Sequence, residues 1–165
     1  MFGFCGRRIF SVVQVDVVLR RGTPADFPAA AEVYLRTRHA SVPAIPPSVH
    51  DDDDVRSWFP GFAAEMELWV GEVDGSIVAL MTLGEDFVEQ LYVLPEHQGR
   101  GIGEALLGVA KQQRPHRLQL WAFESNVRAW HFYERFGFVA VQRTEGDNEE
   151  GAPDVRYEWT PADRQ

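Results

Sequence analysis

Hydrophobic positions recur with a period of two in some stretches of the chain and with a helical period in others. Residues 15–21 (VDVVLRR) predict a first strand. A helix start follows, because Thr23 can act as its N-cap, Pro24 suits the first helical position and Asp26 completes a capping box. Apolar residues then fall on one helical face, so the pattern predicts a helix that ends near Ala40.

The next predicted helix follows a proline-rich loop and begins with a run of acidic residues. Residues 41–50 (SVPAIPPSVH) are predicted to form the loop. The four aspartates at 51–54 suit a helix N-terminus, where carboxylates complement the helix dipole. The run has two interpretations: a capped and solvated helix start, or a negatively charged rim of a substrate site.

Three strand-like stretches come next in the chain. Residues 67–73 and 76–83 flank Asp74-Gly75, which is the signal of a type I′ hairpin turn. The second of these stretches is apolar on both faces, as in a central strand. Residues 87–93 (FVEQLYV) alternate between two faces and predict another strand.

The second half of the chain continues the mixture of strands and helices. The predicted elements are an amphipathic helix from Ile102, a strand at 117–123, a helix capped by Ser125 or Asn126 and ended by Gly137, and closing strands at 138–144 and 155–159. The order β, α, α, β, β, β, α, β, α, β, β predicts a mixed α/β fold. The sequence shows no internal repeat.

A glycine loop, QGRGIG, joins the strand at 87–93 to the following helix. The free N–H groups and the dipole of a helix N-terminus attract an anion, and glycine lets the backbone approach it closely. Two familiar phosphate loops do not fit this one. The P-loop and the dinucleotide fingerprint G-x-G-x-x-G both fail at Glu104 and Leu106.

Composition and charge restrict the remaining choices. The 165 residues are 45% hydrophobic, which suggests one domain over residues 15–165 after an N-terminal extension at 1–14. No apolar run is long enough for a membrane helix, so a cytoplasmic protein is expected. Cys5 is the only cysteine and the five histidines show no metal-ligand spacing, so no metal is expected. The net charge of −9 argues against nucleic acid or an anionic membrane as partner.

The pattern Gln98-x-x-Gly101-x-Gly103 resembles the coenzyme A pyrophosphate loop of the GNAT superfamily of N-acetyltransferases. A second stretch, NVRAWHFYERFGF, resembles the family helix Asn-x-x-Ala-x-x-Phe-Tyr-x-x-x-Gly-Phe. It matches at Asn126, Ala129, Phe132, Tyr133, Gly137 and Phe138. The resemblance covers about residues 15–160 and implies the GNAT fold, a mostly antiparallel central sheet of six to seven strands flanked by about four helices.

The resemblance also implies a binding site for acetyl-coenzyme A. The implied cofactor-binding positions are Leu91, Tyr92, Val93, Gln98, Gly99, Arg100, Gly101, Ile102, Gly103, Asn126, Ala129 and Phe132. Asn126 has a simpler alternative role as a helix cap, and Arg100 as an exposed arginine at a helix start. The family uses a β-bulge on the strand before the loop to splay it from its neighbour, which the sequence does not reveal.

Two residues are expected to carry the chemistry. The resemblance places the Tyr133 hydroxyl at the coenzyme A sulfur, where it would protonate the leaving thiolate; the alternative is an aromatic ring packed beside Phe132. Glu89 is the candidate general base, because it alternates with Leu91 and Val93 along the strand that leads to the cofactor. The alternative for Glu89 is a surface carboxylate, with a water as the base.

The sequence therefore predicts an enzyme that transfers the acetyl group of acetyl-coenzyme A to a primary amine of a small molecule or peptide, by direct attack in a ternary complex. The alternative is a non-catalytic coenzyme A-binding or sensor domain on the same fold. No motif specifies the acceptor amine. The oligomeric state is also open, although many relatives in the family form homodimers through their C-terminal strands.

Overall fold

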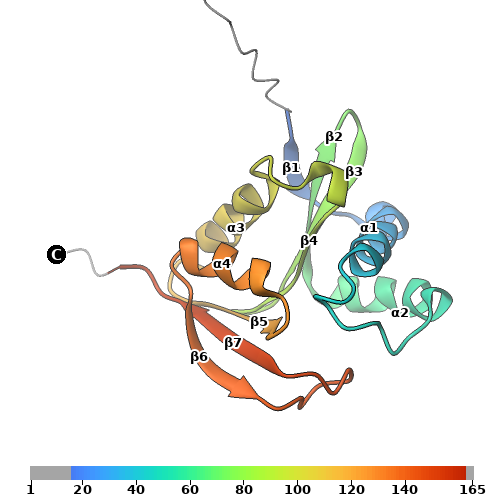
Figure 1. The fold of residues 1–165 in the computed structure, drawn as a ribbon. Helices are drawn as coiled ribbons and strands as arrows, with labels where there is room; N and C mark the ends of the chain where they lie inside the picture. Colours follow the sequence, from blue (N-terminus) through green and yellow to red (C-terminus); the bar gives the residue numbers. More distant parts are fainter. Residues whose placement is uncertain (1–15, 163–165) are drawn as a thin grey trace, which may run out of the picture.

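The computed structural model describes residues 16–162, and the extension predicted at 1–14, with Cys5, lies outside them. Within this range the strands are β1 Val18–Arg21, β2 Glu67–Val73, β3 Ser76–Leu83, β4 Val88–Val93, β5 Leu118–Phe123, β6 Val139–Thr144 and β7 Asp154–Trp159. The α-helices are α1 Phe27–Ala40, α2 Asp52–Glu65, α3 Ile102–Gln113 and α4 Val127–Arg135, and two 3₁₀ helices lie at Pro24–Asp26 and Pro95–His97. The predicted mixed α/β class and the order of its elements are confirmed (Figure 1).

The strands form two antiparallel sheets, with the orders β1-β2-β3-β4 and β5-β7-β6. The sheets touch where β4 begins: Phe87 forms an isolated parallel bridge with Gln119, whose N–H donates to the Asp86 carbonyl oxygen at 2.8 Å. Within residues 16–162 no further ladder pair joins β4 to β5. The seven predicted strands are therefore present, but the hydrogen-bonded ladder is interrupted between β4 and β5, which belong to different sheets.

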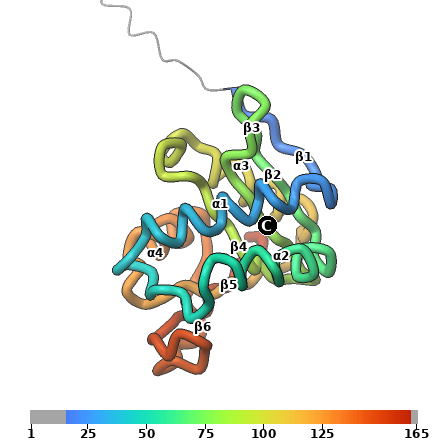
Figure 2. Tube along the Cα trace, turned by 90° about the vertical axis from the view of Figure 1, so that its right-hand side faces the viewer, coloured from blue at the N-terminus to red at the C-terminus, as the bar shows by residue number. Residues whose placement is uncertain are grey.

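Helices cover both faces of the first sheet. Helices α1 and α2 pack on one face, where Figure 2 shows them in front of the strands. Helix α3 packs on the opposite face, and α4 lies beside it, against the second sheet (Figure 1). The buried core between these layers includes Phe59, Leu80, Leu107 and Tyr157, each no more than 1% exposed.

The local signals in the sequence explain where several elements begin and turn. Asp51 is the N-cap of α2, and its side chain accepts a hydrogen bond from the Asp54 N–H at 2.8 Å. The helix-start interpretation of the four aspartates is therefore confirmed. Asp74 and Gly75 have φ angles of 51° and 76°, as the type I′ turn between β2 and β3 requires.

Candidate active site

The glycine loop lies between the end of β4 and the start of α3. Gly99 and Gly101 have φ angles of 74° and 83°, and Gly101 is the N-cap of α3. No described atom lies within 4 Å of the place where a Cβ would stand on either glycine, so the space above them is open. Within residues 16–162, the backbone N–H groups of residues 99–104 donate to no other group. The loop therefore presents free donors at a helix N-terminus, which suits a phosphate group.

Gln98 connects the loop to both neighbouring elements. Its side-chain Nε2 donates to the Val93 carbonyl oxygen at 2.8 Å, and its Oε1 accepts from Arg128 at 2.9 Å. Because Val93 ends β4 and Arg128 lies in the first turn of α4, the Gln98 side chain spans the gap between them. The pattern Gln98-x-x-Gly101-x-Gly103 predicts Gln98 in this loop, whereas Arg128 occupies an unspecified position of the second motif and gives no signal.

Helix α4 brings its motif residues against the glycine loop. Asn126 is the N-cap of α4, and its side chain accepts from the Ala129 N–H at 3.2 Å. The capping alternative for Asn126 is therefore observed, while Ser125 donates elsewhere, to the Ala44 carbonyl oxygen at 2.7 Å. The Phe132 ring lies 3.5 Å from where a Cβ on Gly103 would stand, so α3 and α4 approach closely at this glycine.

Tyr133 lies on α4 among aromatic rings. Its ring centroid is 5.2 Å from Phe132, 5.7 Å from Phe138 and 6.3 Å from Tyr157. Burial raises the pKa of the Tyr133 phenol well above its ordinary value, and the nearby phenol of Tyr92 raises that pKa further. The Tyr133 phenol is therefore protonated at neutral pH.

Glu89 lies at an irregularity in β4. Thr82 pairs with Gln90 and Leu83 pairs with Val88, so Glu89 is an extra residue on its strand. This is a β-bulge, the feature that the family resemblance implies for this strand. The bulge interrupts the alternation with Leu91 and Val93 that makes Glu89 the candidate base, and the Glu89 residue is exposed. Partial desolvation still raises the pKa of the Glu89 carboxyl above its ordinary value.

Two loops far apart in the sequence meet near the end of α1: the α1–α2 loop (residues 41–51) and the β6–β7 loop (residues 145–153). Figures 1 and 2 show these two loops side by side. Arg38, near the end of α1, donates to the Pro46 carbonyl oxygen at 3.3 Å and to the Glu150 carboxylate at 2.9 Å. One arginine therefore holds both loops, although neither contains a motif.

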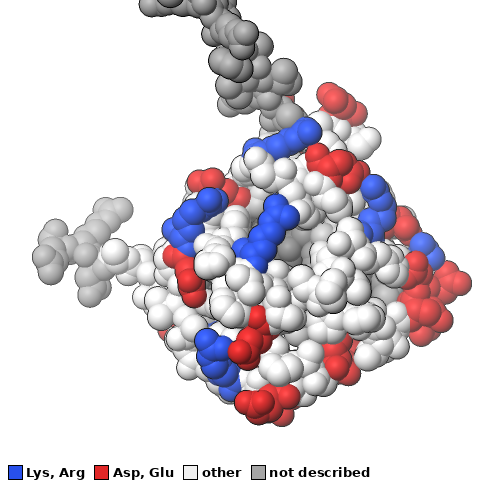
Figure 3. All heavy atoms as spheres, in the orientation of Figure 1, with Lys and Arg blue, Asp and Glu red and all other residues white. Residues whose placement is uncertain are grey.

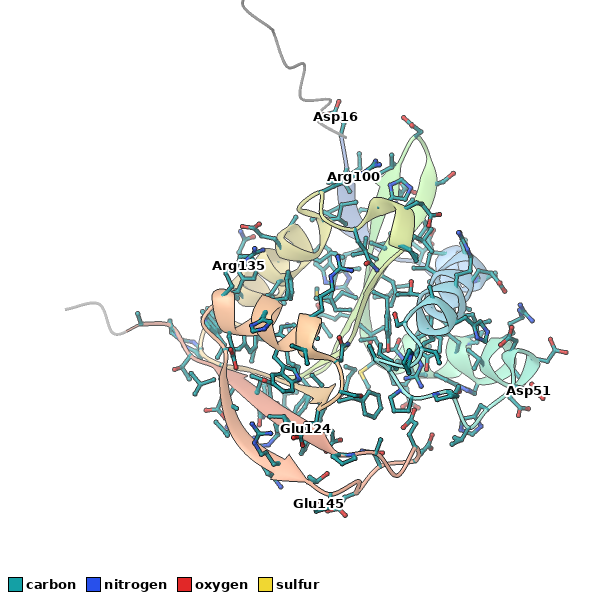
Figure 4. All side chains as sticks on the ribbon, in the orientation of Figure 1. Asp16, Asp51, Arg100, Glu124, Arg135 and Glu145 are labelled. Carbon is teal, nitrogen blue, oxygen red and sulfur yellow. The ribbon has the colours of Figure 1, made fainter. Side chains whose placement is uncertain are left out.

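Charge differs between the two ends of the molecule. Arg100 lies at the glycine loop, whereas Asp51 lies at the far side, at the start of α2 (Figure 4). Figure 3 shows acidic side chains gathered at that edge. Some of this charge is paired within the fold: Asp52 contacts His39 at 2.8 Å and Asp53 contacts Arg56 at 3.0 Å. Among residues 16–162, no helix has the length and apolarity needed to cross a membrane.

Comparisons with known proteins agree with this architecture. The sequence profile of the acetyltransferase (GNAT) domain matches residues 64–140, which include β4, the glycine loop and α4. The chain is 29% identical over 125 residues to the peptidyl-lysine N-acetyltransferase YiaC of Escherichia coli, covering 75% of this chain and 84% of the relative.

Two solved structures extend the comparison to the whole fold. The apo form of YjaB from Escherichia coli superimposes with a TM-score of 0.73 at 25% identity, covering 89% of this chain and 99% of that chain. The structure of yncA from Salmonella typhimurium, with its cofactor acetyl-coenzyme A, has the same fold, with a TM-score of 0.67 at 20% identity over 91% of this chain and 96% of that chain. The domain match, the relative in sequence and the shared fold together support an N-acetyltransferase of the GNAT superfamily.

Proposed function

We propose that this N-acetyltransferase uses acetyl-coenzyme A as its acetyl donor and that its acceptor is the primary amine of a lysine side chain in a peptide. Two comparisons support the proposal: the related YiaC is a peptidyl-lysine N-acetyltransferase, and yncA, which shares the fold, was solved with acetyl-coenzyme A. A role limited to coenzyme A binding has no comparable support, because YiaC, which is related in sequence, is named as an enzyme.

The residues present fit acetyl-coenzyme A. The open space above Gly99 and Gly101 leaves room for the diphosphate, and the unpaired N–H groups of residues 99–104 would hold it. Arg100 adds positive charge at the same loop. The separation of β4 from β5 leaves the outer edge of the β4 backbone near Tyr92 and Val93 open to the cofactor arm, apart from the Val93 carbonyl oxygen, which accepts from Gln98. The observation that carries the proposal is that α4 packs against Gly103 through Phe132, whose ring centroid lies 5.2 Å from that of Tyr133.

The acceptor amine must be neutral when it attacks. A lysine-like amine has a pKa of about 10.4, so its neutral form costs about 4.6 kcal/mol at pH 7. This cost favours a general base, and we assign that role to Glu89, since the raised pKa of its carboxyl improves its proton affinity. Acetyl-coenzyme A supplies the reactive thioester. Tyr133, whose phenol stays protonated, would donate its proton to the departing sulfur.

The proposal is tested by measuring free thiol with a colorimetric reagent. The protein is incubated with acetyl-coenzyme A and, in turn, with a lysine-containing peptide blocked at its N-terminus, with small primary amines, and with no amine. We expect thiol release that depends on the peptide and a mass increase of one acetyl group on its lysine. Thiol release that no amine increases would contradict the proposal.

A further inference from the structure

Buried polar atoms gather where α1 and α2 cover the first sheet. Arg38 Nε, Trp58 Nε1 and Gln90 Oε1 are all buried and have no hydrogen-bond partner among residues 16–162. Native structures leave few such atoms unpaired, because each loses its bonds to water on folding. Their presence together indicates a place where a polar molecule completes the structure.

Trp58 and Arg38 lie against one aromatic ring, that of Tyr34 in α1. The Tyr34 ring centroid lies 5.9 Å from that of Trp58 and 5.3 Å from that of Tyr92. The Arg38 guanidinium carbon lies 5.9 Å from the same Tyr34 centroid. Gln90 precedes Tyr92 by two residues in β4 and so points to the same face of the sheet.

Side chains in contact lead from the β6–β7 loop to β4. Glu150 accepts a hydrogen bond from Arg38, the Arg38 guanidinium lies against the Tyr34 ring, and that ring packs edge-on against Tyr92. The cluster therefore joins Glu150 to the end of β4 that leads to the glycine loop.

The ion pair at the outer end of this cluster is largely buried. The side chains of Arg38 and Glu150 are 9% and 15% exposed, and the bond between Arg38 Nη2 and Glu150 Oε1 is 2.9 Å long. A buried ion pair seldom stabilises a fold more than apolar side chains of similar size. Stability therefore gives no reason for this pair. The second carboxylate oxygen of Glu150, Oε2, has no hydrogen-bond partner among the described residues.

We infer that Glu150 receives the acceptor as its ammonium through its unpaired Oε2 before Glu89 removes the proton, and that Arg38 is the positioning residue that holds the Glu150 carboxylate in place. The inference rests on the proposed function and identifies the end at which the acceptor enters. It selects acceptors that arrive as cations over amines that are neutral in solution.

The decisive variant is Glu150→Gln, because glutamine keeps the oxygen that Arg38 contacts and removes the charge. We expect the acceptor KM for the lysine peptide to rise about 10- to 100-fold, the range for losing a hydrogen bond to a charged group. The KM for acetyl-coenzyme A should not change. The matched control is Glu149→Gln, since Glu149 is the adjacent carboxylate on the same loop, is 70% exposed and contacts His50 instead. Its acceptor KM should equal that of the wild type.

Two further measurements separate recognition from a structural role. In the double variant Arg38→Met/Glu150→Leu the ion pair is replaced by apolar groups, so we expect wild-type thermal stability with a lysine-peptide KM that stays raised. An aromatic amine, which is neutral at pH 7, should show the same KM in Glu150→Gln as in the wild type.

The outcomes are distinguishable. If the wild type acetylates the lysine peptide and Glu150→Gln has an unchanged acceptor KM, this inference is wrong and the proposed function stands. Full recovery of the lysine-peptide KM in the apolar double variant would also overturn it, since the pair would then be structural. If the wild type releases no thiol with any amine, both the inference and the proposed function are overturned.

Discussion

The two ends of the site are built in different ways. The end near the glycine loop is made of backbone: free N–H groups, two glycines with positive φ, and a helix N-terminus. The end near Arg38 and Glu150 is made of side chains that come from a helix and a loop 112 residues apart in sequence. A backbone site requires particular residues at fixed spacing, so it leaves a motif. Side chains that meet from distant elements need no fixed spacing in the chain, so this end leaves no motif.

The largest effect is expected at Tyr133, the proposed proton donor. Tyr133→Phe keeps the ring and its packing but removes the proton donor, so kcat should fall about 100-fold or more. The KM for acetyl-coenzyme A should change little, because the lost interaction belongs to the transition state. Tyr157→Phe is the matched control, since Tyr157 is a buried neighbour of Tyr133. Wild-type kcat in Tyr133→Phe, with chemistry as the slow step, would leave Tyr133 with a packing role only.

The second prediction concerns Glu89, which belongs to neither end by its contacts. Because Glu89 is the proposed general base, the substitution Glu89→Gln should lower kcat/KM about 100-fold. The wild-type rate should fall as the pH is lowered through the raised pKa of this carboxyl, and the variant should lack that acid limb.

Stability provides an independent check on Glu89. Because the pKa of its carboxyl is raised on folding, the folded state binds its proton more tightly than the unfolded state. The free energy of unfolding that this group contributes is therefore present at low pH and is lost as the pH rises through the raised pKa. Glu89→Gln should remove that dependence from thermal melts. An unchanged pH–rate profile in Glu89→Gln would make Glu89 a surface carboxylate and favour water as the base.

The third prediction isolates the backbone end. Gly101→Val places a branched side chain in the open space above the loop and disfavours the positive φ of this residue. We expect the Kd for coenzyme A, measured by calorimetry, to rise about tenfold or more through lost hydrogen bonds to charged oxygens. Gly75→Val is the matched control, because Gly75 has a similar φ of 76° and open surroundings. Equal loss of affinity in both variants would assign the effect to general destabilisation.

The smallest effect is expected for Arg128, which holds Gln98 from α4. Arg128 is exposed, so Arg128→Gln should raise the Kd for coenzyme A only about two- to fivefold, the range of a surface charge interaction. The difference from the wild type should shrink as salt is added. Arg135→Gln, at the other end of α4, should not change the Kd. A loss that is independent of salt would show that Arg128 acts by packing and not by charge.

The same contrast explains what could be predicted from the sequence. The hairpin of β2 and β3, the cap of α2 by Asp51 and the glycine loop each depend on residues close together in the chain, and all were predicted. The division of the sheet was not predicted, since it depends on where Phe87 and Gln119 meet. Arg38 and Arg128 gave no signal, because an arginine on a helix is ordinary until its partner, Glu150 or Gln98, is known.

The separation of β4 from β5 has a thermodynamic consequence. The two sheets together resemble one sheet from which a strand is missing, and a ligand with amide groups along its length would fill the place of that strand. Such a ligand would bind the folded chain and have no site on the unfolded chain. Its concentration would then add RT ln(1 + [L]/Kd) to the free energy of unfolding, about 2.7 kcal/mol at 100 times the Kd. The melting temperature of this protein would therefore report how much of its ligand is present.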